Sequence, residues 1–203
     1  MNLLATLLLA HMIADFPLQL NWVFQLKHRH WAGLLLHAAI HAMTTAVLLR
    51  NPFVHWPIPT TVCVVHFAFD WLKIRIDFKP LSIAFILDQM AHWLVLILLA
   101  TRVSSATGAL SPEHLYPALA YAALPALLMF LSVLSKDLQQ SVSNMAGWSS
   151  KRTAQLVRVS HLLGYPLVIA VLIIRFAGPK NVIADFIARI GVCLLAGSSG
   201  EQS

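Results

Sequence analysis

Long apolar runs separated by short polar connections dominate the chain. A bilayer core about 30 Å thick takes roughly 20 apolar residues per helix, and that window selects six segments in this sequence. They are residues 2–24, 32–49, 59–72, 81–101, 116–135 and 155–176. The pattern predicts an all-α fold, a polytopic transmembrane helical bundle of about six spans.

Composition supports a membrane protein. Hydrophobic residues make up 59% of the chain, charged residues 11%, and the mean hydropathy is +0.75. Globular domains carry about 25% charged residues, so this chain lacks the polar side chains that a water-facing surface of its size requires. A soluble domain is excluded, and an integral membrane protein is predicted.

The formal net charge is +6, and most of the Lys and Arg residues lie between the apolar runs. The first, third and fifth connections hold most of the cations: Lys27, Arg29, Lys73, Arg75, Lys79, Lys136, Lys151 and Arg152. Cytoplasmic connections of membrane proteins are enriched in Lys and Arg. We therefore expect these connections on the cytoplasmic side, both termini on the non-cytoplasmic side, and no nucleic-acid partner.

The apolar runs form a single membrane domain, residues 1–196. Its first half, 1–101, holds four spans, and its second, 102–196, holds two more and an amphipathic stretch at 181–195 that suits the membrane interface. Residues 197–203 read as a flexible tail, typical of sequence added for expression. The N-terminal run is too long for a signal core and is expected to be a retained span. Cys63 and Cys193 form neither a disulfide pattern nor a metal motif.

Ionisable residues recur at i, i+4 spacing in the first four predicted spans. The pairs are His11 with Asp15, His37 with His41, His66 with Asp70, and Asp88 with His92. Random placement of the Asp and His residues would give about one such pair in the chain. A charge at the centre of a spanning helix costs roughly 2.5–3.5 kcal/mol on insertion scales, so each pair calls for a function. Residues four apart share a helix face, so each pair points one way.

Most of these side chains are expected in one layer, about 7–17 Å from the cytoplasmic edge at 1.5 Å per residue. No Lys or Arg is expected at that depth in these spans, so the three carboxylates call for cations. We predict two divalent metal ions, Zn first and Fe or Mn as alternatives. The predicted ligands are His11, Asp15, His37, His41, His66, Asp70, Asp88 and His92, with Gln19 and Gln89 orienting them.

Other polar residues receive simpler interpretations. His28, His30, His55 and His114 are predicted in loops. His161 has no partner at helical spacing and is interpreted as a packing residue, and Asp137 as a solvated residue at the membrane edge. Two metal-free interpretations of the paired residues stay open: a proton or ion pathway, and polar helix packing.

The motif His11-x-x-x-Asp15-Phe16-x-x-Gln19, followed by His37 and then by Asp88-Gln89-x-x-His92, resembles a bacterial family of integral membrane proteins of unknown function. The resemblance covers about residues 5 to 95 of the chain. It implies a membrane location and repeated use of these His, Asp and Gln positions, and we expect that membrane to be the bacterial inner membrane. It implies no activity or substrate.

Site chemistry favours a metal-dependent hydrolase that acts on a membrane lipid or lipid-linked substrate from the cytoplasmic side. Asp70 and Asp88 are the predicted catalytic carboxylates, with Asp70 as the general base. Lys73, Arg75 and Lys79 are the candidates for binding an anionic headgroup, and ordinary positive-inside placement explains them equally well. A di-iron oxidoreductase acting on acyl or isoprenoid chains and a metal-ion or proton-coupled transporter are the alternatives. The oligomeric state is left open.

Overall fold

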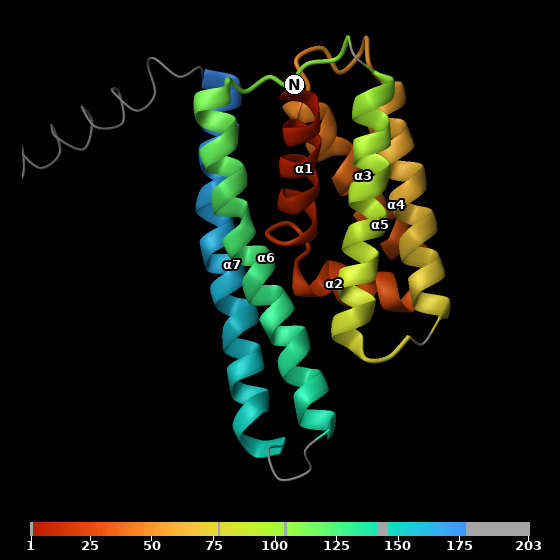
Figure 1. The fold of residues 1–203 in the computed structure, drawn as a ribbon, viewed down its shortest axis with the longest axis vertical. Helices are drawn as coiled ribbons and strands as arrows, with labels where there is room; N and C mark the ends of the chain where they lie inside the picture. Colours follow the sequence, from red (N-terminus) through yellow and green to blue (C-terminus); the bar gives the residue numbers. More distant parts are fainter. Residues whose placement is uncertain (1, 77, 104, 142–145, 178–203) are drawn as a thin grey trace, which may run out of the picture.

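The computed structural model describes residues 2–76, 78–103, 105–141 and 146–177 (Figure 1). These residues form an all-helical bundle, as the apolar pattern predicted. Its helices are α1 (Asn2–Asp15), α2 (Asn21–Arg29), α3 (Trp31–Leu48), α4 (Pro57–Arg75), α5 (Leu81–Arg102), α6 (Pro112–Ser141) and α7 (Ala146–Ala177). The predicted interfacial stretch and tail lie outside the described residues.

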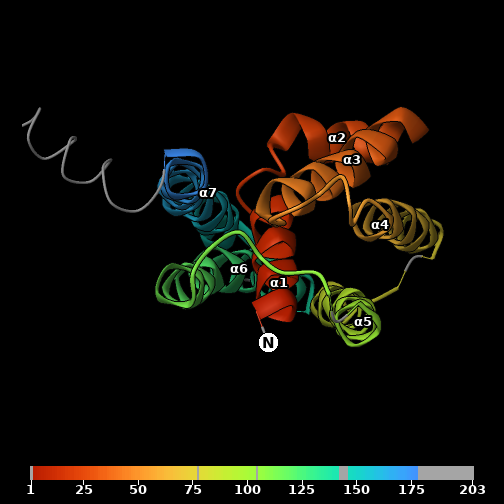
Figure 2. The same ribbon diagram turned by 90° about the horizontal axis from the view of Figure 1, so that it is seen from above.

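Helix α1 is the centre of the bundle. It packs against α3, α5 and α6, while α4 packs between α3 and α5, and α7 pairs with α6 (Figure 2). Nearly every side chain of α1 is buried. We call the end of the bundle at which α1 begins the upper end, and the opposite end the lower end. The described part of α7 also finishes at the upper end (Figure 1).

Many polar side chains of the bundle are buried, and many large apolar side chains cover its outer face. On α5 the buried residues include Gln89 and His92, whereas Leu87, Met90 and Leu94 are exposed. Exposing these apolar side chains to water would cost free energy, whereas exposing them to the hydrocarbon of a bilayer does not. The arrangement therefore suits a lipid environment.

Four helices are long and apolar enough to cross a membrane: α3, α5, residues Pro112–Leu138 of α6 and residues Arg152–Ala177 of α7. They coincide with the second, fourth, fifth and sixth predicted spans. The third predicted span lies within α4, a 19-residue helix that runs alongside α5 (Figure 1). The span count of six stays a prediction.

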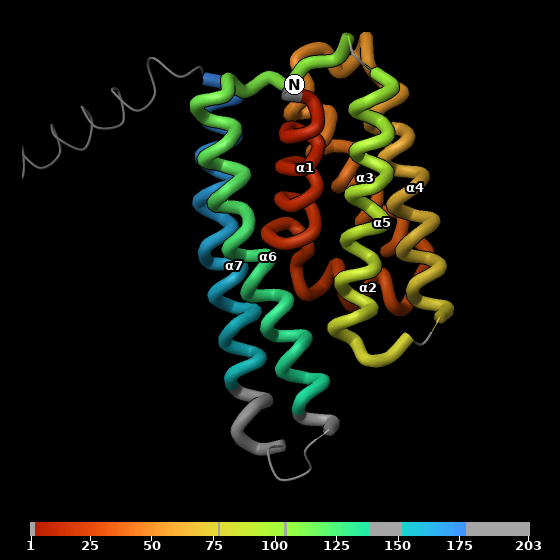
Figure 3. Tube along the Cα trace, in the orientation of Figure 1, coloured from red at the N-terminus to blue at the C-terminus, as the bar shows by residue number. Residues whose placement is uncertain are grey.

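The prediction of one continuous first span over residues 2–24 is wrong. Helix α1 ends at Asp15 after 14 residues, and α2 starts separately at Asn21 (Figure 3). Pro17 causes the break, because proline has no N–H for the helix ladder and its ring disfavours helical geometry at Phe16. The chain turns, and α2 lies across the lower part of the bundle. Asp15 therefore lies at a helix end deep inside the molecule.

Apolar packing fills the upper part of the bundle around α1. Leu3 and Leu7 of α1 pack with residues from α4, α5 and the connections, namely Leu49, Ile58, Val62, Leu96 and Ala106. We call this group the upper apolar layer. It closes the upper end above the polar residues that follow along α1.

Candidate metal centre

Three imidazoles from two helices surround the carboxylate at the end of α1. Asp15, His37, His41 and His66 are all buried, and each offers a ligand atom within 4.8 Å of the others. We call these residues the four-residue centre. Oδ1 of Asp15 lies 3.2 Å from Nε2 of His37, 3.2 Å from Nε2 of His41 and 3.7 Å from Nε2 of His66.

Helical periodicity places these side chains. The buried residues of α4 are Ile58, Val62, His66 and Asp70, each four positions from the next, so one stripe of α4 faces α1 and α3. On α3, His37 and His41 belong to the buried face in the same way. The sequence pattern therefore predicted correctly that these pairs point inward.

The geometry fits a small cation. In a tetrahedral site with metal–ligand bonds of about 2.0–2.1 Å, neighbouring ligand atoms lie about 3.3 Å apart, close to the distances around Asp15. Nε2 of His66 is buried and has no hydrogen-bond partner among the described residues, although it faces two carboxylates. The C-terminal end of α1 adds the negative end of a helix dipole at this point. These features together favour a bound cation.

Gln19 and Gln89 connect the centre to its surroundings, and their role in orienting metal ligands stays a prediction. The amide of Gln89 donates to Asp15 Oδ2 at 2.9 Å, and its carbonyl accepts from His11 Nε2 at 3.1 Å. The amide nitrogen of Gln19 lies 3.1 Å from Nε2 of His37. His11 is thus placed beside the four-residue centre, with its Nε2 3.4 Å from Asp15 Oδ2.

The other two predicted carboxylate ligands pair with lysines. Lys27 donates to both oxygens of Asp70, at 3.1 and 3.0 Å, and both side chains are buried. Lys73 donates to Asp88 at 2.6 Å. The assumption that no Lys or Arg lies at this depth is wrong, because the turn after Pro17 folds Lys27 of α2 into the bundle. These pairs remove the charge argument for a second metal ion.

Asp70 remains adjacent to the centre, whereas His92 lies at its edge. Oδ2 of Asp70 lies 3.6 Å from Nε2 of both His37 and His66. The ring centroid of His92 lies 4.2 Å from that of His66, and its Nδ1 donates to the backbone carbonyl of Asp88 at 2.8 Å.

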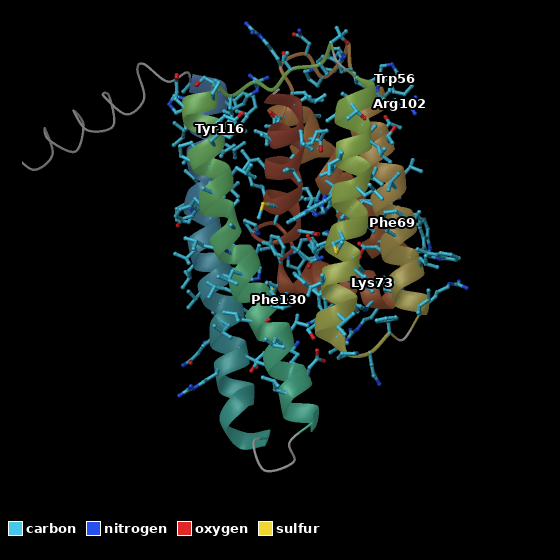
Figure 4. The ribbon with its side chains drawn as sticks, in the orientation of Figure 1. Trp56, Phe69, Lys73, Arg102, Tyr116 and Phe130 are labelled. Atoms are coloured by element: carbon cyan, nitrogen blue, oxygen red, sulfur yellow. The ribbon has the colours of Figure 1, made fainter. Side chains whose placement is uncertain are left out.

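A cavity of about 340 Å³ adjoins the centre, with Asp15 in its wall. The polar and charged residues in its lining are Asp15, Gln19, Asn21, Lys27, His28, Asp70, Lys73, Asp88, Gln89, Ser132, Lys136 and His161. Figure 4 shows Lys73 in the lower half of the bundle, and Trp56 and Arg102 near its upper end. The cavity therefore lies on the lower side of the upper apolar layer.

The lysines that line the cavity differ from the cations that the sequence predicted for headgroup binding. Of the three predicted headgroup residues only Lys73 lines it, while the guanidinium of Arg75 lies 4.3 Å from the centre of the Trp71 ring. Lys27 and Lys136 line it, although sequence analysis assigned neither a role at the site. No spacing rule links Lys136 to the paired residues, because it comes from a distant helix.

Two histidines differ from their predicted settings. His28 lies in α2 and His114 in α6, so the prediction of loops was wrong for both. His161 lines the cavity. Asp137 does not stay free in solvent: its carboxylate accepts from the backbone N–H groups of Leu81 and Ser82, at 2.9 and 2.6 Å, and caps the start of α5.

Comparison with known proteins agrees with the resemblance seen in the sequence. A family model described as "Protein of unknown function (DUF3307)" matches residues 3–116, more than half of the chain. The chain belongs to this family. The match includes every member of the four-residue centre and ends within α6. Searches of curated proteins and of solved structures found no match.

Proposed function

We propose that this protein is an intramembrane metal-dependent hydrolase of the bacterial inner membrane. Its substrate is a lipid or lipid-linked molecule that enters the cavity from the lower, cytoplasmic side. The observation that supports this most is that Asp15 belongs both to the four-residue centre and to the cavity wall. A metal ion held there lies within reach of a molecule in the cavity.

One metal ion suits the residues better than two. Three imidazoles and one carboxylate form a ligand set that Zn²⁺ accepts readily, and Fe or Mn are alternatives. Bound there, the ion would supply Lewis-acid polarisation of a carbonyl or phosphoryl oxygen and activate water. Asp70, which lies beside His37 and His66, would take the proton from the attacking water. Water then adds to the ester, the ester bond breaks, and that proton passes to the leaving alcohol.

The lysine pairs favour hydrolysis over the di-iron alternative. Di-iron centres in helical bundles use several carboxylates, which bridge and balance the two ions. Here Asp70 and Asp88 each form an ion pair with a lysine, so Asp15 is the carboxylate left for a metal. A single Lewis-acid site needs no more than that.

Transport of a metal ion or proton is a second candidate, which the interrupted first helix favours. Ion sites in transporters often lie at the ends of broken helices near the middle of the membrane, and α1 ends at Asp15 inside the bundle. The upper apolar layer opposes this function, because an ion passing from the centre to the upper end would have to cross it.

Metal analysis of the purified protein in detergent tests the proposal. We expect about one Zn per chain, and His66→Ala and His37→Ala should reduce that content at least tenfold. His55→Ala is the matched control, since His55 lies in the turn between α3 and α4 at the upper end. Full metal content in both centre variants, or no metal in the wild-type protein, would overturn the proposed centre.

A second measurement separates hydrolysis from transport. Wild-type protein is reconstituted into proteoliposomes that contain an ester- or phosphoester-linked lipid. The alcohol released from this lipid is followed by mass spectrometry. Asp70→Asn should lower the rate at least a hundredfold while keeping the metal. Metal or proton uptake by the proteoliposomes without any lipid cleavage would support the transporter instead.

A further inference from the structure

Two residues beyond the family match complete the cavity. Lys136 of α6 and His161 of α7 both line it, and both lie after residue 116, where the match ends. Met129, Ser132 and Val133 also contribute from α6, and their spacing places them on the helix face that includes Lys136. The α6–α7 hairpin therefore forms a wall of the cavity.

Charge pairing leaves Lys136 as the available cation. Lys27 is bound by Asp70 and Lys73 by Asp88, so two of the three cavity lysines are already neutralised. Lys136 forms no hydrogen bond or ion pair with the residues that the structure describes, and it is exposed. Its ammonium group carries three donors and no acceptor, so it suits the oxygens of an anion.

His161 offers a complementary group. The residue is 9% exposed, and its Nδ1 is buried with no hydrogen-bond partner among the described residues. The ring hydrogen-bonds the backbone of Pro17 through its other nitrogen. Because that nitrogen donates to a carbonyl, Nδ1 of the neutral ring is an acceptor. An unpaired buried acceptor in a cavity wall suits a ligand hydroxyl group.

We infer that the α6–α7 hairpin recognises the headgroup of a phospholipid, with Lys136 binding the phosphate and His161 accepting a hydrogen bond from a headgroup hydroxyl. The inference names the substrate class of the proposed hydrolase and rests on that function. Phe16, Phe85 and Val133 in the lining provide apolar surface for the glycerol and the start of the acyl chains. A few polar groups in an apolar pocket determine ligand orientation.

Binding of short-chain lipids to the full chain in uncharged detergent tests this inference. The probe is dihexanoyl phosphatidylglycerol, with dihexanoyl phosphatidylcholine and inorganic phosphate as comparisons, followed by isothermal titration calorimetry. Lys136→Gln should weaken phosphatidylglycerol binding about tenfold, and Lys136→Arg should restore it. His161→Gln should weaken it about threefold. Arg75→Gln is the control, because Arg75 lies outside the cavity lining, and it should bind like the wild type.

The comparison ligands and the metal content distinguish a failure of this inference from a failure of the proposed hydrolase. Unchanged binding in Lys136→Gln, or an equal loss in Arg75→Gln, would overturn the inference. Equal affinity for phosphatidylcholine would overturn the role of the hydroxyl, and equal affinity for inorganic phosphate would overturn the lipid as ligand. A wild-type protein that binds phosphatidylglycerol as expected but holds no metal would overturn the proposed hydrolase and support this site.

Discussion

Asp15, Asp70 and Asp88 are similar in the sequence and differ in the structure. Each was predicted to bind metal because each lies four positions from a histidine inside a predicted span. Their neighbours separate them: Asp15 faces three imidazoles, Asp70 contacts Lys27, and Asp88 contacts Lys73. Spacing along one helix determines which side chains share a face. It does not determine which cation another helix contributes.

The Lys27–Asp70 pair provides a prediction at this scale. Lys27→Met removes the cation and leaves a buried carboxylate without its partner, since the two side chains are only 8% and 4% exposed. We expect a loss of about 3–5 kcal/mol in the free energy of unfolding, measured by denaturant titration in detergent. The double variant Lys27→Met with Asp70→Asn should recover most of that loss, because it buries no charge. A single variant as stable as the wild type would contradict the importance of this pair.

At the scale of helices, the break at Pro17 positions most of the site. It ends α1 at Asp15 and lets α2 turn across the lower part of the bundle, where Lys27 reaches Asp70. The same turn is covered by α7, because a Cβ on Gly164 would overlap the ring of Pro17. Proline at residue 17 was visible in the sequence. The direction of the chain after it depends on packing against helices that are distant in sequence.

Gly33 supplies the prediction at the element scale. A Cβ at this position would overlap the backbone of Leu26 and Lys27, so α2 and α3 approach closely only because residue 33 has no side chain. Ala is favoured over Gly inside a helix by about 1 kcal/mol, yet we expect Gly33→Ala to destabilise the protein by about 1–3 kcal/mol. It should also reduce lipid binding, because α2 carries Lys27 and His28 of the cavity wall.

Thermal unfolding in detergent and lipid titration measure these two effects. Ala32→Val is the matched control, since Ala32 is exposed in the same turn and can take extra bulk without a clash. A more stable Gly33→Ala protein would show that α2 does not pack as closely as described.

Across the whole molecule, the cations gather at the lower end. Lys73 and Arg75 in the last turn of α4 and Lys79 after it lie at that end, while Arg50 and Arg102, the last residue of α5, lie at the upper end. The cavity lies on the lower side of the upper apolar layer. Under the positive-inside rule we therefore expect the cavity to face the cytoplasm.

Cysteine labelling tests this orientation. In a background with Cys63 and Cys193 replaced by Ser, we introduce Asn51→Cys at the upper end or Lys79→Cys at the lower end. In sealed right-side-out vesicles, a membrane-impermeant maleimide should label the Asn51→Cys protein at once and the Lys79→Cys protein only after permeabilisation. The reverse pattern would place the cavity on the outer side.

The sequence by itself determined the helical membrane fold, the positions of most helices and the inward direction of the His and Asp pairs. These features follow from local periodicity and from the cost of placing polar groups in lipid. Only the tertiary structure decided where the chain turns after Pro17, that Lys27 and Lys73 neutralise two carboxylates, and that α6 and α7 add Lys136 and His161 to the cavity. The reason is physical: charge balance and cavity shape depend on contacts between residues far apart in the chain, which spacing along one helix does not encode.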